Sequence, residues 1–274
     1  ADVPLLNVAI AGVIGDSQGA LFAQKCVEKG MAKATFGTGT TIMVYTKEPI
    51  KGKHGLVTSL AWGMDGEVHY ALEGIINTSG DTIRWLKNEL QLFTEFAEIE
   101  AAANSIVDNC GVYLIPAFVG LGAPYWSPDS RAAIFGMDRS TTKNHLIRAG
   151  LESIAYQVKD IIELVCSETD ITIKELRVDG GATENKFLMQ FLADMLDAKV
   201  IVSDTAELSA MGAVYLSGLS SGVWGSFEEI RQLDAEYHTY HPEMSRDTAE
   251  NYYREWKRYV HLLVQENIKV FIRS

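Results

Sequence analysis

The sequence predicts an α/β fold in which a mixed sheet is flanked by helices. Short runs of β-branched and aromatic residues alternate along the chain with longer segments whose apolar residues recur every three or four positions. Several short runs end in glycines just before a helical pattern begins, as strands do at the ligand-binding edge of an α/β sheet. With 274 residues and 47% hydrophobic content, the chain can bury one large core or two smaller ones.

The first element is an apolar run at residues 8–14, which we expect to be a buried strand leading into a helix from Ser17 onward. Asp16 lies at the corner between them. Ligands bind beyond the carboxyl ends of strands in open α/β sheets, so a lone carboxylate there can act as a general base. Taken alone, however, a Gly-Asp pair after a strand is more often a turn with a helix cap.

Residues 34–46 form the next element, two β-rich arms around Gly37, Thr38 and Gly39, which is the pattern of a hairpin. Bare backbone at the two glycines lets a phosphate approach closely and accept hydrogen bonds from the amides. An ordinary tight turn would have the same sequence. A second hairpin is predicted at residues 56–76, because turn residues separate two further β-rich segments there.

The rest of the chain alternates between helical and strand patterns. A loop at residues 119–128 is rich in glycine, proline and aromatic residues, as loops that line or cover a cleft often are. We expect Trp126 to anchor this loop by burying its ring. The spacing of apolar residues predicts helices at 83–90, 93–107, 142–165, 184–196, 207–219 and 247–265, and strands at 111–118, 176–182 and 199–202.

A second candidate ligand site follows the strand at residues 176–182, where Gly180 and Gly181 precede a helix. Glycines let backbone and ligand touch, and a helix start supplies free amides and the positive end of the helix dipole. This pattern is typical of a nucleotide-binding corner. It contains neither GxGxxG nor a P-loop lysine, which argues against a dinucleotide site and a Walker site.

The composition limits the partners. A formal net charge of −12 and a pI of about 5.0 argue against nucleic acid or an anionic membrane as the main partner. No apolar stretch approaches the roughly 20 residues of a spanning helix, and the start lacks a basic signal-peptide head, so the cytoplasm is the expected location. The three cysteines, Cys26, Cys110 and Cys166, have neither disulfide nor zinc spacing, and we expect buried or half-buried thiols.

Taken together, the acid, the Gly-Thr-Gly hairpin and the Asp-Gly-Gly corner resemble the ribonuclease H-like fold of the actin and hexokinase ATPases. Four motifs, in family order, resemble the C-terminal domain of the FGGY carbohydrate kinases, and within that family the glycerol kinase branch. They are GDSQGALF at 15–22, TFGTG at 35–39, APYW at 123–126, and VDGGA with FLMQ between 178 and 190. The resemblance covers about residues 6–265.

The resemblance implies an ATP-dependent sugar or polyol kinase and assigns roles by position. Asp16 matches the general base that takes the proton from the substrate hydroxyl as it attacks the γ-phosphate. Mg²⁺ is expected with the ATP, held by Asp16 and by a carboxylate outside this chain. Substrate contacts are expected from Asp16, Ser17 and Thr41. The implied nucleotide site comprises Gly37, Thr38, Gly39, Gly80, Arg84, Gly180, Gly181 and Asn185.

Three of these positions depart from the pattern that the resemblance implies. Ser17 stands where glycerol kinases usually have a polyol-binding glutamine, and Thr41 where they place a phenylalanine against the substrate's carbon chain. Both changes shrink a side chain, so we expect a wider pocket and a longer polyol or a ketose as substrate. Arg84 stands where the family often has glutamine, which puts a cation beside the nucleotide.

The resemblance also implies a partner domain. FGGY kinases begin with another actin-like domain that carries the first phosphate loop and most sugar contacts. We therefore expect residues 1–274 to be a single C-terminal domain that has no turnover by itself, from an enzyme that forms homo-oligomers when full length. Two alternatives remain open. The first is a non-catalytic nucleotide-sensing or assembly module of the actin-like group, although such a module has no use for a base at Asp16. The second is a hydrolase that uses Asp16 with Asp179, although nothing in the sequence places these two carboxylates together.

Overall fold

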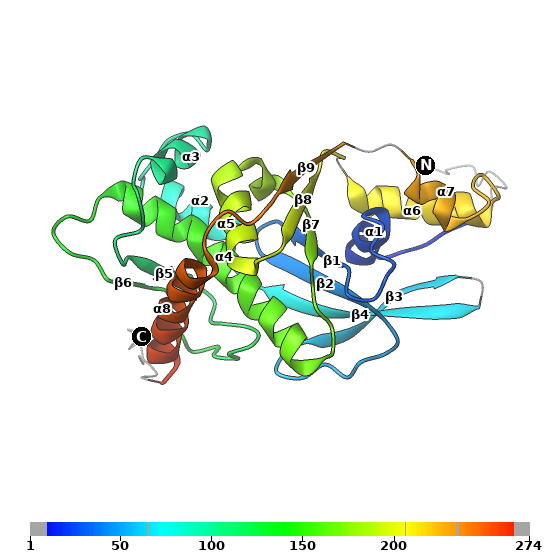
Figure 1. The fold of residues 1–274 in the computed structure, drawn as a ribbon, viewed down its shortest axis with the longest axis horizontal. Coiled ribbons are helices and arrows are strands. Elements are labelled where there is room, and N and C mark those ends of the chain that lie inside the picture. Colours follow the sequence, from blue (N-terminus) through cyan, green and yellow to red (C-terminus); the bar gives the residue numbers. More distant parts are fainter. Residues whose placement is uncertain (1–9, 65, 206, 234–235, 266–274) are drawn as a thin grey trace, which may run out of the picture.

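The computed structural model describes residues 10–64, 66–205, 207–233 and 236–265, and Figure 1 shows its fold. A seven-stranded sheet in the order β3-β4-β2-β1-β7-β8-β9 runs through the molecule, and β5 and β6 form a separate two-stranded sheet. The large sheet is mixed, because β1, β7 and β8 are parallel while the other neighbours are antiparallel. Helices flank it on both faces, which confirms the predicted α/β class.

The elements have the following bounds. The strands are β1 (Ala32–Phe36), β2 (Thr40–Lys47), β3 (Val57–Met64), β4 (Glu67–Ile76), β5 (Tyr113–Ile115), β6 (Ala133–Phe135), β7 (Glu175–Asp179), β8 (Lys199–Ser203) and β9 (Tyr237–Tyr240). The helices are α1 (Asp16–Ala23), α2 (Gly80–Asn88), α3 (Ala97–Asn104), α4 (Lys143–Glu168), α5 (Lys186–Leu196), α6 (Leu208–Ser220), α7 (Phe227–Arg231) and α8 (Arg246–Gln265), with a 3₁₀ turn η1 at Gly181–Glu184.

Strand β1 lies in the middle of the sheet and fixes where the two glycine motifs end up. It pairs antiparallel with β2 as far as Phe36 and Thr40, and parallel with β7 as far as Thr35 and Asp179. The hairpin tip after β1 and the double glycine after β7 therefore emerge at the same edge of the sheet.

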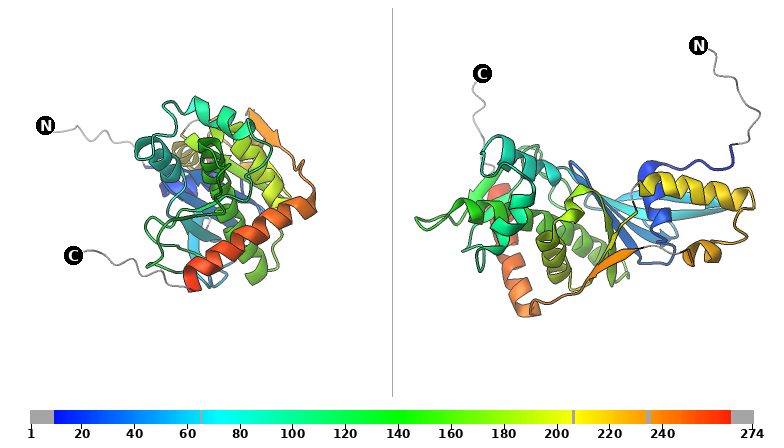
Figure 2. Two further views of the ribbon diagram at one scale, coloured as in Figure 1. Left: turned by 90° about the vertical axis from the view of Figure 1, so that its left-hand side faces the viewer. Right: turned by 90° about the horizontal axis from the view of Figure 1, so that it is seen from above.

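The two faces of the sheet carry different helices. On one face, the 26-residue helix α4 packs with α5 in the main core, which includes Ile42 and Val44 of β2. On the other face α1 and α6 lie side by side (Figures 1 and 2), and α1 buries Leu21 and Phe22 completely. Burying such a side chain stabilises the fold by about 1.5–3 kcal/mol. A Cβ atom on Gly212 would overlap the backbone of Gly19, so glycine lets α6 lie directly against α1.

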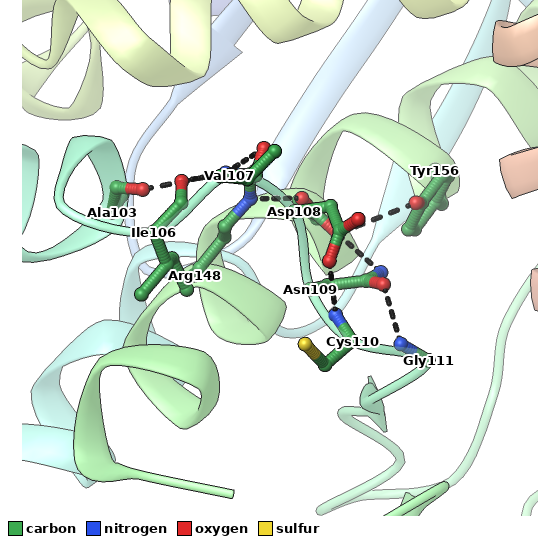
Figure 3. A network of polar contacts seen from close by, with 10 residues as sticks. Ala103, Ile106, Val107, Asp108, Asn109, Cys110, Gly111, Arg148 and Tyr156 are labelled. Atoms are coloured by element: carbon green, nitrogen blue, oxygen red, sulfur yellow. Dashed lines mark hydrogen bonds and ion pairs between the residues drawn. The ribbon is translucent and has the colours of Figure 1, made fainter. Parts of the chain in front are cut away.

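Helix α4 contains a buried ion pair whose arginine also binds the end of α3 and the residues after it (Figure 3). Arg148 Nε donates to Glu152 Oε1 at 2.7 Å, and both side chains are at most 8% exposed. Asn109 Nδ2 donates to the other oxygen of Glu152 at 2.8 Å. Arg148 Nη1 donates to the carbonyl oxygens of Ala103, Ile106 and Val107. These contacts replace the water that both charges lose on burial, so removing either partner leaves an uncompensated charge.

The strand expected at residues 8–14 is not formed in the part of it that the structure describes. Residues 8 and 9 lie outside the described residues; from 10 to 15 no strand is present, and Ile10 and Val13 are 85% and 81% exposed. Apolar β-formers make a strand only beside a pairing neighbour, and β1 already has β2 and β7 on its two sides. The segment lies against α6 instead, where a Cβ atom on Gly12 would come within 2.7 Å of Ser217 Oγ.

Two smaller expectations were also wrong. Trp126 is 63% exposed and lies over Gly55, while its neighbour Tyr125 anchors the loop by donating from its hydroxyl to buried Asp160 at 2.9 Å. Of the cysteines, Cys26 is buried, but Cys110 and Cys166 are exposed. Within the described ranges, no helix combines the length and the apolar character needed to cross a bilayer.

Candidate functional site

Asp16 is the first residue of α1 and its side chain is exposed. Gly15 before it is extended, with φ −68° and ψ 159°, so the chain turns into the helix at this residue. The amide of Ser17 donates to Asp16 Oδ1 at 2.6 Å, and the positive end of the helix dipole favours a negative charge there. Ser17 is half-buried beside it. The carboxylate is thus fixed at a helix start and open to a ligand.

The hairpin tip presents unpaired amides. Gly37 N donates to Gly39 O at 2.8 Å, which closes the turn, and the Thr38 carbonyl accepts from Ser79 N at 3.0 Å. Among the described residues, the amides of Thr38 and Gly39 have no hydrogen-bond acceptor. A Cβ atom on Gly39 would overlap the Ile76 carbonyl, so the tip needs glycine at this position. Two such amides on a tight turn are suited to binding an anion.

Helix α2 docks on this tip and adds a cation. The Gly80 amide donates to Gly37 O at 3.2 Å, and a Cβ atom on Gly80 would overlap the same carbonyl. Arg84 Nη2 donates to Thr38 Oγ1 at 2.8 Å and to Asp81 Oδ1 at 3.1 Å, and its side chain is 48% exposed. The first amides of α2 are therefore used on the hairpin, and the positive charge at the tip comes from Arg84.

The double glycine after β7 touches the same hairpin. Gly180 has φ 97° and ψ 168°, and a Cβ atom on it would overlap the Phe36 carbonyl at the end of β1. A Cβ atom on Gly181, by contrast, would meet no atom within 4 Å. Asn185 is 8% exposed and caps α5, with its Oδ1 accepting from Leu188 N at 2.8 Å. A contact from Asn185 to a ligand would therefore come from its amide nitrogen or its backbone.

A cleft of about 690 Å³ opens beside this corner. Ligand sites of proteins have volumes of about 300–1,000 Å³. Gly180 and Gly181 line it, whereas the hairpin tip, Gly80, Arg84 and Asn185 lie outside its lining. Sequence reasoning missed several lining residues, which are Thr35, Thr183, Lys186, Ser203, Asp204, Ser209, His238 and Tyr240. Thr35 and Thr183 belong to the two glycine motifs, and Lys186 is a basic residue shortly after the double glycine. The others come from the end of β8, from β9 and from α6, whose convergence depends on the tertiary fold.

The wall of the cleft holds a buried charge network. Asp179 ends β7 and accepts from Gln24 Nε2 at 2.6 Å. Burial raises the pKa of Asp179, and the nearby charge of Lys33 opposes that rise. Lys33 of β1 is fully buried; burial lowers its pKa, while the carboxylates of Asp179, Glu73 and Asp16 raise it. Thr41 lies on β2 directly opposite Thr35, one strand away from this wall.

These contacts join the hairpin tip, the start of α2 and the double glycine into one continuous surface. Gly80 touches Gly37, Gly180 touches Phe36, and Phe36 leads into the tip. The unpaired amides and the guanidinium can donate hydrogen bonds to phosphates, and the glycines, which have no side chain, let the phosphates come close to the backbone. Within the described residues, no group of three His, Cys, Asp or Glu side chains could hold a metal ion.

Comparison with known proteins gives a consistent result. The model of the C-terminal domain of the FGGY family of carbohydrate kinases matches residues 32–221. Glycerol kinases from Xylella fastidiosa (strain M12) and Oceanobacillus iheyensis are 47% and 48% identical over 255 residues, covering 93% of this chain and 51% of each relative. The chain thus spans about half the length of the curated relatives it matches.

Solved structures agree. That of Plasmodium falciparum glycerol kinase with ADP has a TM-score of 0.88 and 34% identity, covering 94% of this chain and 52% of that one. The xylulose kinase from Rhodospirillum rubrum shares the fold, with a TM-score of 0.80, 20% identity, and coverage of 93% and 51%. On the strength of the matched domain and these relatives, the chain belongs to the FGGY family of carbohydrate kinases.

Proposed function

We propose that this chain is the nucleotide-binding half of an ATP-dependent sugar or polyol kinase, which transfers the γ-phosphate of ATP to a substrate hydroxyl. The observation that carries the proposal is the continuous surface formed by the hairpin tip, the start of α2 and the double glycine after β7. The glycerol kinase with a TM-score of 0.88 contains ADP, which supports a nucleotide at the corresponding surface here.

In this proposal the phosphates lie over the hairpin tip and the adenosine lies toward the double glycine. The amides of Thr38 and Gly39 and the guanidinium of Arg84 are the donors to the phosphates, and Gly80 lets α2 pack closely enough on the Gly37 carbonyl to hold the tip in place. Gly180, Gly181 and Asn185 form the adenosine end of the site. The hairpin tip itself carries no charged side chain, and Arg84 of α2 is the one cation proposed beside it. Most of the donors to the phosphates would therefore be backbone amides, as expected for a chain with a net charge of −12.

Asp16 is the proposed general base, accepting the proton of the attacking hydroxyl while its own helix start keeps the carboxylate in place. A magnesium ion bound with ATP would neutralise charge on the phosphates, and Asp16 is the residue of this chain proposed to help hold it, together with a carboxylate outside this chain. Phosphoryl transfer depends mostly on positioning and charge neutralisation, so the reaction needs no acid-base group of the protein other than this one carboxylate.

The proposal includes a second, N-terminal actin-like domain in the whole protein. The relatives are about twice as long as the matched region, which supports this. Because a kinase cleft needs both walls to hold two substrates, we expect the 274-residue chain to bind adenine nucleotide weakly and to phosphorylate nothing. We also propose a cytoplasmic homo-oligomer for the full-length enzyme, as the family resemblance implies.

Asp16→Asn in the full-length enzyme tests the function. We expect kcat to fall by about 10²–10⁴, because the base acts on the transition state. Full activity in the variant would refute Asp16 as the base. Turnover by the 274-residue chain by itself, lost in Asp16→Asn, would refute the need for a second domain.

The substrate is proposed to be a longer polyol or a ketose. Ser17 and Thr41 are both half-buried and both small, and they occupy positions that the resemblance assigns to the substrate. Phosphorylation rates of the full-length enzyme with glycerol, erythritol, xylulose and ribulose decide the question. A kcat/KM that is highest for glycerol would contradict the wider pocket.

A further inference from the structure

Lys33 is a fully buried lysine in the central strand of the sheet, and its role is not explained by packing. Its neighbours across the strands are Met43 on β2 and Arg177 on β7. Its exposed fraction is 0%. A buried ammonium costs several kcal/mol of desolvation, and apolar residues of similar volume commonly replace buried charges without loss of stability. A methionine would therefore serve the core at least as well.

The contacts of Lys33 lead to the wall of the cleft. Lys33 Nζ donates to Thr35 Oγ1 at 2.9 Å, and Thr35 lies directly beside Asp179 in the parallel register of β1 and β7. Burial raises the pKa of Asp179, and the Lys33 charge and the Thr35 side chain both lower it. Thr35 and Asp179 both line the cleft beside Gly180. The ion pairs found among the described residues do not include Lys33, so the ammonium acts on Asp179 across the threonine and not by direct pairing.

A second buried side chain contacts the same carboxylate. Gln24, just after α1, is 2% exposed and donates from Nε2 to Asp179 Oδ2. Its Oε1 is buried with no partner among the described residues, which is an unusual cost for a buried amide. Two polar side chains are therefore buried at an energetic cost, and both hold Asp179.

An ionised carboxylate has about four acceptor positions. Gln24 occupies one of those of Asp179, Thr35 lies beside the residue on the neighbouring strand, and Asp179 lines the cleft. We propose that Lys33 is a positioning residue for the candidate nucleotide site: through Thr35 its ammonium fixes the Asp179 carboxylate, whose remaining lone pairs accept from an O–H donor of the bound nucleotide. The donor is either a ribose hydroxyl or a water on the magnesium ion. This inference rests on the proposed function.

The test compares Lys33→Met with Lys33→Arg in the full 274-residue chain, measuring the Kd for ADP by calorimetry and the free energy of unfolding by urea. Lys33→Met should be at least as stable as the wild type and should bind ADP at least tenfold more weakly, and Lys33→Arg should restore part of the affinity. Lys159→Met is the matched control: Lys159 is 6% exposed and its ammonium pairs with Glu250 at 3.0 Å, outside the cleft lining. It should leave the Kd unchanged.

A double-mutant cycle identifies the route. Asp179→Asn should weaken ADP binding, and adding Lys33→Met to it should cause no further loss, because both changes remove one interaction. Additive losses, or a wild-type Kd in Lys33→Met, would overturn the proposal. If Lys33→Met does not fold, Thr35→Val decides, since it removes the connecting hydroxyl at nearly constant volume.

Two further arms identify the donor and separate the inference from the function. In the first, 2′-deoxy-ADP replaces ADP: if it binds the wild type more weakly and its Kd does not change in Asp179→Asn, the donor is the ribose hydroxyl. In the second, magnesium is added or left out: if Asp179→Asn raises the Kd for ADP only with magnesium, the donor is the bound water. If neither result is obtained, the proposed O–H donor is refuted. If the wild-type chain does not bind ADP, the proposed function fails for this chain. The Lys33 contact is then tested by carboxylate ¹³C NMR: the pKa of Asp179 should rise in Lys33→Met, and an unchanged value refutes the link.

Discussion

Replacing Gly180 and Gly181 separately by alanine should affect different properties, although the two residues are neighbours: the first change should lower stability and the second should weaken ADP binding. Gly180 has φ 97° and ψ 168°, a region populated almost only by glycine, and forcing alanine into it costs about 1–3 kcal/mol. The new methyl group would also overlap the Phe36 carbonyl, and relieving such overlap adds about 1–3 kcal/mol. We expect Gly180→Ala to lose about 3 kcal/mol of unfolding free energy, which lowers Tm by roughly 6–12 °C.

Gly181→Ala is the matched comparison. Its methyl group would meet no atom within 4 Å, so stability should change by less than about 0.5 kcal/mol. Because Gly181 lines the cleft, the same methyl group should weaken ADP binding several-fold. The assays are urea unfolding and calorimetric titration with ADP on both variants. Equal stability losses in the two variants, or a stable Gly180→Ala, would refute the argument from backbone conformation.

Two more predictions concern the core. Glu152→Gln should lower the unfolding free energy by about 3–5 kcal/mol in urea melts, because Arg148 stays buried without its counter-charge. The double replacement of Arg148→Met with Glu152→Leu should recover much of that loss, since no buried charge remains. A loss below about 1 kcal/mol in the single variant would contradict this reasoning. Burial raises the pKa of Asp160 from 3.8 to about 6, so the folded state binds this proton more tightly than the unfolded state. As the pH rises from 4 to 6, the wild type should therefore lose about 2 kcal/mol of stability that Asp160→Asn does not lose. Parallel pH profiles of the unfolding free energy would contradict this.

Patterns within a short stretch of sequence predicted the site motifs well. The hairpin around Gly37 and Gly39, the helix that begins at Asp16 and the strand before Gly180 are all present, because turn glycines and helix spacing are local signals. The helix after the double glycine begins at Lys186, two residues later than expected, since 181–184 form a 3₁₀ turn.

Features that depend on distant partners were not predictable in the same way. The run ending at Ile14 has strand composition, but the described part of it has no strand to pair with. Conversely β9 was not predicted, because its few residues form a strand only through pairing with β8. The roles of Tyr125 and Trp126 were exchanged for a similar reason: the acceptor that buries a tyrosine hydroxyl, Asp160, is supplied by α4. Lys33 gave no signal, since a lysine in a β-rich run is usually on the solvent side.

The central claim is that a nucleotide lies on the surface made by the two glycine corners. Amide chemical shifts of the ¹⁵N-labelled chain, followed during titration with Mg·ADP, test it most directly. The largest changes should occur at Thr38, Gly39, Gly180 and Gly181. Saturable binding that leaves these four amides unchanged and shifts those of α8 instead would contradict it.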